Sequence, residues 1–499
     1  MFQKVLIANR GEIAVRIIRA LRDMNISSVA VFSDADRGAL HVRLADEAEH
    51  IGPAPSSESY LRIDRVLEAA RKHGADAIHP GYGFLSENAN FAAACEDAGV
   101  VFIGPSAESI RRLGSKIAAR ILAKQAGVPV VPGNEEPATN VSHARKLARE
   151  LGYPVLLKAA AGGGGKGMRQ VDRESDLEGA IRDASSEAER AFHNAEVYIE
   201  KVILQPRHIE MQIAGDLYGN LVHLGERECS LQRRHQKIIE ECPSPFIAKN
   251  PEMRDSMGDA ALRIAREAGY YNLGTAEFLA DPDGNFYFLE VNTRLQVEHP
   301  VTELVTGLDL VQLQLKIAAG DGLPFAQEDV RWNGWAMECR VCAEDPENQF
   351  FPSPGRIAQL REPSGPGIRL DSGVYPGWTV PLDYDPLLAK LVAWAPDRHT
   401  AIQRLHRALG EYAVAGVKTN LAFFREILED EQFREGRLDT GFVAGLLARR
   451  KPSVPPEPML EVAATLAAVA ASKNGKPAVG VESKESSAWR TEGRGRLLR

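Results

Sequence analysis

The sequence of 499 residues predicts a multidomain protein that combines a parallel α/β domain with α+β regions. Three observations support this fold class. The length corresponds to about three domains. The first hundred residues alternate short apolar runs with helical patterns, which is typical of a parallel, doubly wound sheet. Later in the chain, strand-like runs are joined by turn signals, which predicts antiparallel hairpins.

The N-terminal region shows the clearest alternation of elements. Strands are expected at KVLIAN, SSVAVFS, ADAIHP and VVFIGP, and helices at EIAVRIIRALRDM, SYLRIDRVLEAARKHG and NANFAAACEDAG. The turn at 9–12 contains a single glycine. The GYG at 81–83 is followed by Ser86 where a dinucleotide-binding fingerprint needs a third glycine. The pattern therefore argues against a Rossmann dehydrogenase.

The composition narrows the function classes. Hydrophobic residues make up 44% and charged residues 26% of the chain, as in an ordinary globular protein. The net charge of −8 gives no electrostatic footprint for nucleic acid or an anionic membrane. Because we find neither a signal peptide nor an apolar run of about 20 residues, we expect a cytoplasmic location. Cys339 and Cys342 lie three apart in a strand-like run and would face opposite sides, which argues against a redox or zinc role.

A glycine-rich tract at 162–167 superficially suggests a P-loop. A P-loop needs glycine at 160 and Ser or Thr at 167, where this chain has Ala160 and Gly167. The flanking runs YPVLLKA and MRQV are strand-like, so we expect a glycine-rich hairpin whose backbone N–H groups can close over phosphate oxygens. Lys158, in the strand before the tract, would supply a positive charge for the phosphates. A flexible turn is the alternative.

A second hairpin is predicted by TAEFLA at 275–280 and NFYFLEVN at 285–292, which flank the turn signal PDG. If the turn is centred between Asp283 and Gly284, Glu277 lies opposite Glu290. Like charges that face each other across a ladder are destabilising unless a cation joins them. With the Asn292 amide, the two carboxylates form an oxygen set that suits Mg²⁺ or Mn²⁺ better than zinc. A register shift of one residue would separate the two acids.

Polar and apolar residues alternate along the continuation of this strand. The polar positions are Glu290, Asn292, Arg294, Gln296 and Glu298. In an extended chain these side chains project from one side. Phe286 and Phe288 share this parity, so we expect one face to run from an apolar core into a functional site. An amphipathic strand with a solvated face is the alternative.

Three further features are ambiguous on their own. A lone lysine such as Lys116 is usually at the surface, and a lone histidine such as His208 is more often structural. The strand-like run VYIEKVI at 197–203 has backbone groups that can contact an adenine edge. The QRRHQK segment at 232–237 is consistent with a solvated charge run and with an anion site.

Taken together, these segments resemble the biotin carboxylase family, the ATP-grasp component of acyl-CoA carboxylases and of pyruvate carboxylase. The resemblance covers about residues 1–447. It is carried by IANRGEIA at 7–14, HPGYGFLSEN at 79–88, KAAAGGGGKGM at 158–168, QRRHQK at 232–237, EVNTRLQVEHPVTE at 290–303 and ECRVCAED at 338–345.

The resemblance implies three domains and a tail. An N-terminal α/β domain would span 1–114, an ATP-grasp domain 115–334 with a lid at about 131–203, and a C-terminal domain 335–447. Residues 448–499 begin with a Pro-rich linker and are expected to be flexible or to dock on a partner.

The family's functional residues transfer to matching positions of this sequence. The implied ATP contacts are Lys116, Lys158, Gly164, Gly165, Glu200, Lys201, Val202, Ile203, His208, His235, Glu277 and Glu290. The implied metal ligands are Glu277, Glu290 and Asn292, in agreement with the hairpin argument. Bicarbonate contacts fall on Lys237, Arg294, Gln296 and Val297. The implied catalytic residues are Arg294, Lys237, Glu298 as the base and Arg340 as the biotin-side arginine.

The implied reaction is carboxylation of biotin with ATP and bicarbonate, as the first half-reaction of an acyl-CoA carboxylase. Glu298 would deprotonate bicarbonate as it attacks the γ-phosphorus to form carboxyphosphate, which breaks down to CO2 and phosphate. None of the eight methionines precedes a lysine, so biotin is expected on a separate carrier protein. A carboxyltransferase subunit and a homodimer are further implied. The alternatives are another ATP-grasp carboxylate–amine ligase and a non-catalytic nucleotide-binding scaffold.

Overall fold

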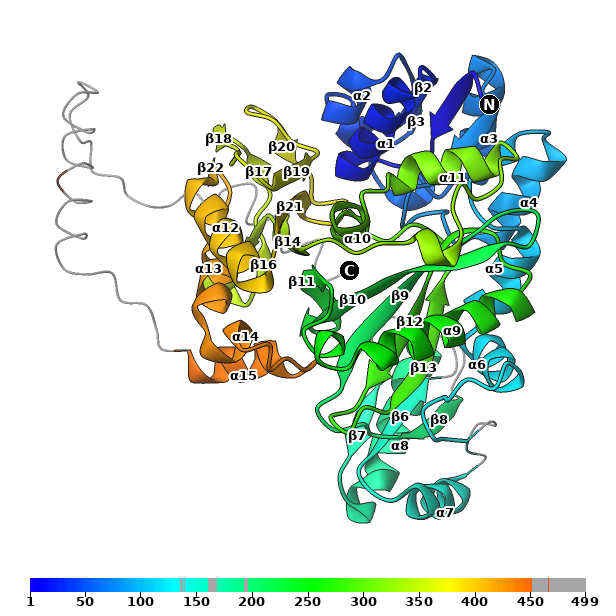
Figure 1. Ribbon diagram of the computed structural model, residues 1–499, viewed down its shortest axis with the longest axis vertical. Helices are drawn as coiled ribbons and strands as arrows, with labels where there is room; N and C mark the ends of the chain where they lie inside the picture. Colours follow the sequence, from blue (N-terminus) through cyan, green and yellow to red (C-terminus); the bar gives the residue numbers. More distant parts are fainter. Residues whose placement is uncertain (135–137, 139, 160–167, 193–195, 451–464, 466–499) are drawn as a thin grey trace. The chain divides into compact units, whose positions relative to one another are not determined.

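The computed structural model describes residues 1–134, 138, 140–159, 168–192, 196–450 and 465 (Figure 1). The chain divides into two compact units, Met1–Leu446 and Leu447–Arg499. The Pro-rich linker expected at 451–458 lies outside the described residues. Within the described part of the chain, no helix combines the length and the apolar character needed to cross a bilayer.

A five-stranded parallel sheet forms the N-terminal region, in the order β3-β2-β1-β4-β5. Its strands are β1 (Lys4–Ile7), β2 (Ser27–Ser33), β3 (Glu47–Gly52), β4 (Ala77–His79) and β5 (Val101–Phe102). The connecting helices include α1 (Gly11–Asp23), α2 (Leu40–Leu44), α3 (Ile63–His73) and α4 (Ala89–Asp97). Val5 and Ile7 pack in the core that contains α1, whereas Leu6 packs in the core that contains α3. The predicted doubly wound sheet is confirmed.

Strand β3 does not follow from the sequence pattern. Its sequence, EAEHIG, has no apolar run, because β3 lies at the edge of the sheet and only Ile51 and Gly52 are buried.

A small three-stranded sheet lies in the middle of the chain, in the order β7-β6-β8. β6 (Val155–Ala159) pairs antiparallel with both β7 (Arg169–Val171) and β8 (Val197–Lys201). Helices α7 (Val141–Leu151) and α8 (Glu174–Phe192) pack on this sheet around Leu157 and Ile199. The predicted flanking strands of the glycine tract are confirmed. The tract itself, 160–167, lies outside the described residues.

An antiparallel sheet of eight strands joins the middle of the chain to its C-terminal region, in the order β13-β12-β9-β10-β11-β14-β21-β19. Its strands are β9 (Arg207–Gly215), β10 (Leu221–Arg233), β11 (Gln236–Cys242), β12 (Asn272–Ala280), β13 (Phe286–Asn292), β14 (Trp335–Cys342), β19 (Ile368–Ser372) and β21 (Leu387–Ala395). The pairing of β11 with β14 carries the sheet across the domain boundary expected at 335.

Two sets of helices cover the two faces of this large sheet (Figure 1). Helix α9 (Pro251–Glu267) packs on the face that carries Ile209, Met211 and Ile213. Helices α10 (His299–Thr306) and α11 (Leu310–Ala318) pack on the opposite face, where Ala214 joins the core that contains α11. Because side chains alternate along a strand, Glu210 and Gln212 point toward the α10 face. This face carries the site described below.

The remaining elements complete the described chain. They are α5 (Ala107–Gly114), α6 (Lys116–Gln125), β15 (Glu344–Asp345), β16 (Phe351–Pro352), β17 (Gly355–Arg356), β18 (Gln359–Arg361), β20 (Thr379–Val380), α12 (Arg398–Glu411), β22 (Ala413–Ala415), α13 (Leu421–Glu429), α14 (Glu431–Arg434) and α15 (Phe442–Arg449).

The predicted β12–β13 hairpin is confirmed, but one expectation about its faces is wrong. Glu277 pairs with Glu290, whereas the next residue, Phe278, pairs with Phe288 and leaves Leu289 as an extra residue. This β-bulge reverses the parity of β13. Phe288 therefore lies on the α9 face in contact with Phe278, and Glu290 lies on the other face.

Candidate active site

Paired acids at the β12–β13 hairpin form one wall of the site. Glu277 and Glu290 occupy directly opposed positions, and Thr275 opposes Asn292, so the predicted register holds at this end of the hairpin. The Asn292 amide donates a hydrogen bond of 2.8 Å to Glu277 Oε1. These side chains supply the oxygens that a divalent cation prefers, and a cation between them would relieve the repulsion of two facing carboxylates. A site for Mg²⁺ or Mn²⁺ stays a prediction here, because Lys237 and His208 contact Glu277, and Arg294 donates to the Asn292 oxygen.

Lys237, at the start of β11, is the central cation of the site. Its Nζ lies 2.6 Å from Glu210 Oε2, 2.9 Å from Glu277 Oε1 and 2.7 Å from Glu298 Oε1. Burial disfavours a charged lysine, but the three carboxylates outweigh this effect and raise the pKa of Lys237 well above its usual value. Lys237 is therefore a fixed positive charge, not a solvated member of a charge run.

Glu298 lies directly before α10 and is completely buried. Lys237 binds its Oε1, and Arg340 Nη2 donates a hydrogen bond of 2.8 Å to its Oε2. Burial opposes ionisation, yet Lys237, Arg340 and Arg227 hold the pKa of Glu298 well below its usual value. The carboxylate is therefore ionised at neutral pH.

A chain of hydrogen bonds links the polar residues after β13. Arg294 donates 2.9 Å and 2.8 Å hydrogen bonds to Asn292 Oδ1 and Gln296 Oε1, and its Nε contacts Glu87 at 2.9 Å. Gln296 in turn donates a 3.2 Å hydrogen bond to Glu277. The regular strand ends at Asn292, but the alternating polar side chains still converge on one site.

Arg340 extends the site into the C-terminal region. It lies on β14, and its Nε donates a 2.6 Å hydrogen bond to Glu240 Oε1 on the neighbouring strand β11. Its Nη2 binds Glu298, so one guanidinium bridges two carboxylates. Nearby, the buried Lys390 donates a 3.0 Å hydrogen bond to the backbone oxygen of Val297 and fixes that segment.

The tip of the β10–β11 hairpin lies within the QRRHQK segment. Arg234 and His235 form a two-residue turn with φ of 50° and 67°, a left-handed conformation that favours glycine or asparagine. Both side chains are exposed. The preceding Arg233 anchors the hairpin, because it lies 3.1 Å from Glu344 and stacks on Phe350 at 4.4 Å from the ring centroid. Arg233 thus joins the hairpin to the C-terminal region.

Residues expected to contact the nucleotide lie on two sheets. His208 Nε2 is 2.9 Å from Glu277 Oε2 on the large sheet. On the small sheet, Lys158 and Glu200 form an ion pair, and Arg120 binds the same carboxylate at 2.6 Å. Lys201 ends β8 with its Nζ 2.7 Å from the oxygen of Gly152, and Val202 and Ile203 follow it in the chain.

Contact with a nucleotide stays a prediction for all of these residues. Gly164 and Gly165 lie outside the described residues, and Lys116 is placed only as the first residue of α6.

Two buried charged side chains of this network are absent from the sequence-based expectations. Arg227 is completely buried and binds Glu210, Gln212 and Thr302 as well as Thr275, so it ties β9, β10, β12 and α10 together. Glu210 binds both Arg227 and Lys237. The sequence signal that could have identified them is a charged residue in the middle of a buried strand, since such residues are rarely buried without a partner.

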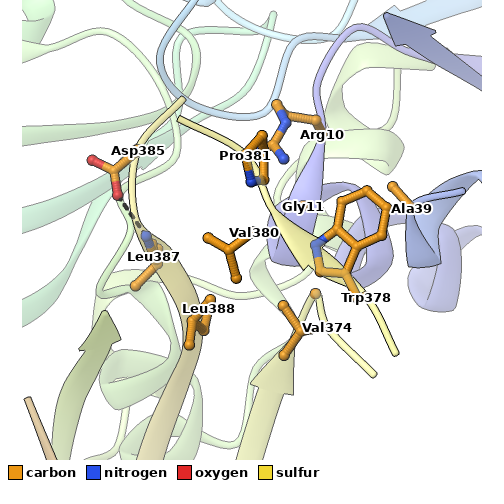
Figure 2. A pocket seen from close by; sticks show the side chains of 11 residues that line it. Arg10, Gly11, Ala39, Val374, Trp378, Val380, Pro381, Asp385, Leu387 and Leu388 are labelled. Carbon is orange, nitrogen blue, oxygen red and sulfur yellow. Dashed lines mark hydrogen bonds between the residues drawn. The ribbon is translucent and has the colours of Figure 1, made fainter. Parts of the chain in front are cut away.

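A separate pocket lies between the N-terminal and C-terminal regions (Figure 2). Arg10, Gly11 and Ala39 of the N-terminal region line it together with Trp378, Val380, Leu388 and neighbouring residues of the C-terminal region. None of the expected site residues lines this pocket.

The fold and the site define an ATP-grasp ligase: a large antiparallel sheet with paired acids, and a small sheet that carries Lys158 and Glu200. Family models agree with this class. Residues 1–110 match the biotin carboxylase N-terminal domain, 115–326 the ATP-binding domain of the carbamoyl-phosphate synthase L chain, and 338–445 the biotin carboxylase C-terminal domain. The chain belongs to the biotin carboxylase family.

Curated proteins and solved structures support this assignment. The chain is 52% identical over 444 residues to biotin carboxylase 1 of Bacillus subtilis, covering 89% of this chain and 98% of the relative. It is 52% identical over 437 residues to the biotin carboxylase of Haemophilus influenzae, covering 87% and 97%. The biotin carboxylase of Campylobacter jejuni, solved as a β-γ-ATP complex, has a TM-score of 0.86 and 46% identity, covering 89% and 99%.

A further similar structure contains ligands of the reaction. The biotin carboxylase domain dimer of Hydrogenobacter thermophilus 2-oxoglutarate carboxylase was solved with MgADP, ADP and bicarbonate. It has a TM-score of 0.85 and 47% identity, and the alignment covers 89% of this chain and 98% of that chain.

Proposed function

We propose that this chain carboxylates biotin with ATP and bicarbonate through carboxyphosphate. The observation that carries the proposal is the geometry of Glu298, a buried carboxylate held ionised between Lys237 and Arg340. A general base must be ionised and must be within reach of its proton. Glu298 meets the first condition, and its neighbours Lys237, Arg294 and Gln296 supply the polar groups to orient a small anion beside it.

The proposed roles of these residues belong to two successive chemical steps. Arg294, Gln296 and the backbone at Val297 bind bicarbonate, and Glu298 takes its proton as the oxygen attacks the γ-phosphorus. Lys237 stabilises negative charge that develops on the transferred group, as is usual in phosphoryl transfer. A Mg²⁺ or Mn²⁺ ion held by Glu277, Glu290 and Asn292 supplies further neutralisation of the phosphates when it is bound.

Arg340 serves the biotin step. Carboxyphosphate yields CO2 and phosphate, and the released phosphate removes the ureido proton of biotin. The guanidinium of Arg340 then stabilises the enolate that attacks CO2. Its position between Glu240 and Glu298 supports this role, because Arg340 is already oriented toward the bicarbonate base.

The expected nucleotide residues fit the same scheme. Lys116, Lys158, Gly164 and Gly165 would bind the phosphates, and Glu200 to Ile203 with His208 and His235 would bind the rest of ATP. We further propose that 131–203 acts as a lid that excludes water from the intermediate. The domains are proposed as 1–114, 115–334 and 335–447, with 448–499 as a tail.

The proposal extends to partners. Biotin would arrive on a separate carrier protein, and carboxybiotin would pass to a carboxyltransferase of the same assembly. A homodimer is the expected form, since the similar Hydrogenobacter domain is a dimer in its structure. We propose a cytoplasmic location.

The test is ADP release by the purified chain with Mg²⁺, with bicarbonate and free biotin added separately and then together. We expect turnover that requires bicarbonate and rises with biotin. ADP release that is indifferent to both would reject the proposal and favour another carboxylate–amine ligase. Nucleotide binding without turnover under any of these conditions would favour a non-catalytic scaffold.

A further inference from the structure

A pair of buried acids lies beneath Arg340, outside the residues used above. Glu240 on β11 and Glu338 on β14 are directly opposed across the antiparallel ladder. Side chains of opposed residues point to the same face and lie close together. Both residues have an exposed fraction of 0%. The structure therefore places two acids side by side, away from bulk solvent.

The cations near this pair are too few for two negative charges. Arg340 donates a 2.6 Å hydrogen bond to Glu240 Oε1, but its other end is bound to Glu298. Lys390 opposes Arg340 on β21 and favours ionisation of Glu338, but its Nζ is also 3.2 Å from Glu12 and bonded to a backbone oxygen. The remaining charged groups that act on the pair are Lys237, which favours ionisation of Glu240, and Glu298, which opposes it.

Three carboxylate oxygens of the pair accept no hydrogen bond from the described residues. They are Glu240 Oε2 and both oxygens of Glu338. A buried ionised carboxylate without a donor is strongly unfavourable. Adjacent carboxylates that cannot both ionise resolve this by holding one proton between them. Burial raises the pKa of Glu240 to about 7 and the pKa of Glu338 well above its usual value, in agreement with this arrangement.

We propose that Glu338 carries a proton and donates it as a hydrogen bond to Glu240 Oε2, so that the pair holds Arg340 with a single negative charge. Glu240 and Glu338 are then positioning residues for the biotin step, which rests on the function proposed above. With a single negative charge on the Glu240–Glu338 pair, the guanidinium of Arg340 stays hydrogen-bonded to both Glu240 and Glu298. A second charge on Glu338 would draw the guanidinium away from Glu298 and from the biotin side.

The sign of the pH dependence follows from this placement. Glu338 is protonated when the chain is folded and ionised at neutral pH when it is unfolded, so folding takes up a proton. Stability therefore decreases as pH rises above the ordinary glutamate range. Glu338→Gln keeps a neutral donor in the same place and removes this decrease.

The direct test is the infrared spectrum of the full chain at neutral pH. We expect a carbonyl band of a protonated carboxyl that shifts in deuterium oxide, disappears in Glu338→Gln and persists in the control Glu241→Gln. Glu241 lies on the same strand as Glu240 but binds Trp335 and Arg398, away from the pair. A spectrum in which Glu338→Gln removes no such band would overturn the proposal. Glu12 is also buried, with its pKa raised to about 7, so Glu12→Gln is a second control in which the band of Glu338 should persist.

Activity separates positioning from a purely structural role. We expect Glu338→Gln to retain biotin carboxylation and Glu240→Gln to lower kcat of the biotin step on the order of a hundredfold, while bicarbonate-dependent ADP release persists. If Glu338→Gln lost the biotin step as Glu240→Gln does, a neutral Glu338 would be refuted. If the wild-type chain showed no bicarbonate-dependent turnover, the proposed function would fail, and the infrared result would still decide the protonation of the pair.

Discussion

Replacement of Glu298 by glutamine changes the proposed base with minimal change of shape. Both carboxylate oxygens accept hydrogen bonds from cations, Oε1 from Lys237 at 2.7 Å and Oε2 from Arg340 at 2.8 Å. A glutamine amide has one oxygen and one NH2 group, so one cation must face a donor in either orientation. Loss of one charge-assisted hydrogen bond costs roughly 1.5–3 kcal/mol of stability. The catalytic loss is larger, because removal of a general base lowers the rate by roughly 10²- to 10⁴-fold.

The assay for Glu298→Gln is bicarbonate-dependent ADP release, with nucleotide affinity measured in parallel. We expect bicarbonate-dependent ADP release to fall as stated and nucleotide affinity to be largely retained, because Glu298 is linked to the expected nucleotide residue Glu277 through Lys237. Glu226→Gln is the matched control. Glu226 is equally buried and binds Arg254 through two hydrogen bonds of 2.6 and 2.8 Å, but it contacts none of the expected site residues.

Two results would refute this reasoning. Loss of ATP binding in Glu298→Gln would reassign Glu298 to the nucleotide site. Bicarbonate-dependent turnover within about tenfold of the wild-type rate would show that another group takes the proton. The control should lose stability by about 3 kcal/mol and keep its kcat, which separates the role of the base from the cost of breaking a buried ion pair.

Three further predictions concern the same network. Arg340→Ala should abolish biotin carboxylation and spare slow bicarbonate-dependent ATP hydrolysis; survival of both activities would exclude the biotin-side role. Arg227→Gln leaves Glu210 with a single cation, so it should lower stability by roughly 3–5 kcal/mol and raise the KM for bicarbonate, and an unchanged KM would make Arg227 purely structural. The pKa of Glu298 is held below 4.5, so its contribution to stability is complete above that pH and is lost as pH falls further. Acid unfolding curves should therefore be flatter for Glu298→Gln than for the wild-type chain.

Local patterns predicted the parallel sheet, the hairpin and the polar segment that follows it. The turn signal PDG predicted the hairpin, but the pairs nearest the turn, such as Phe278 with Phe288, would place Leu289 opposite Glu277, and only the bulge at Leu289 brings Glu290 into that position. The alternation from 290 to 298 indicated that its polar side chains would converge. Alternating apolar runs predicted the parallel sheet. These features depend on residues close in sequence, where turn chemistry and side-chain periodicity dominate.

Other features could not be predicted, because they depend on contacts between distant segments. The bulge at Leu289 moved Phe288 to the α9 face, and no local signal marks it. Arg227 became important only when β9, β12 and α10 were brought around it. Likewise, the pairing of Glu240 with Glu338 joins strands almost a hundred residues apart, so neither acid is conspicuous in the sequence.

The most direct test of the central claim is transfer of labelled bicarbonate to biotin by the purified chain. We predict label in carboxybiotin that requires both ATP and Mg²⁺ and is lost in Glu298→Gln and in Arg340→Ala. If ATP were hydrolysed in the presence of bicarbonate and biotin while biotin remained unlabelled, the assignment as a biotin-carboxylating enzyme would be contradicted.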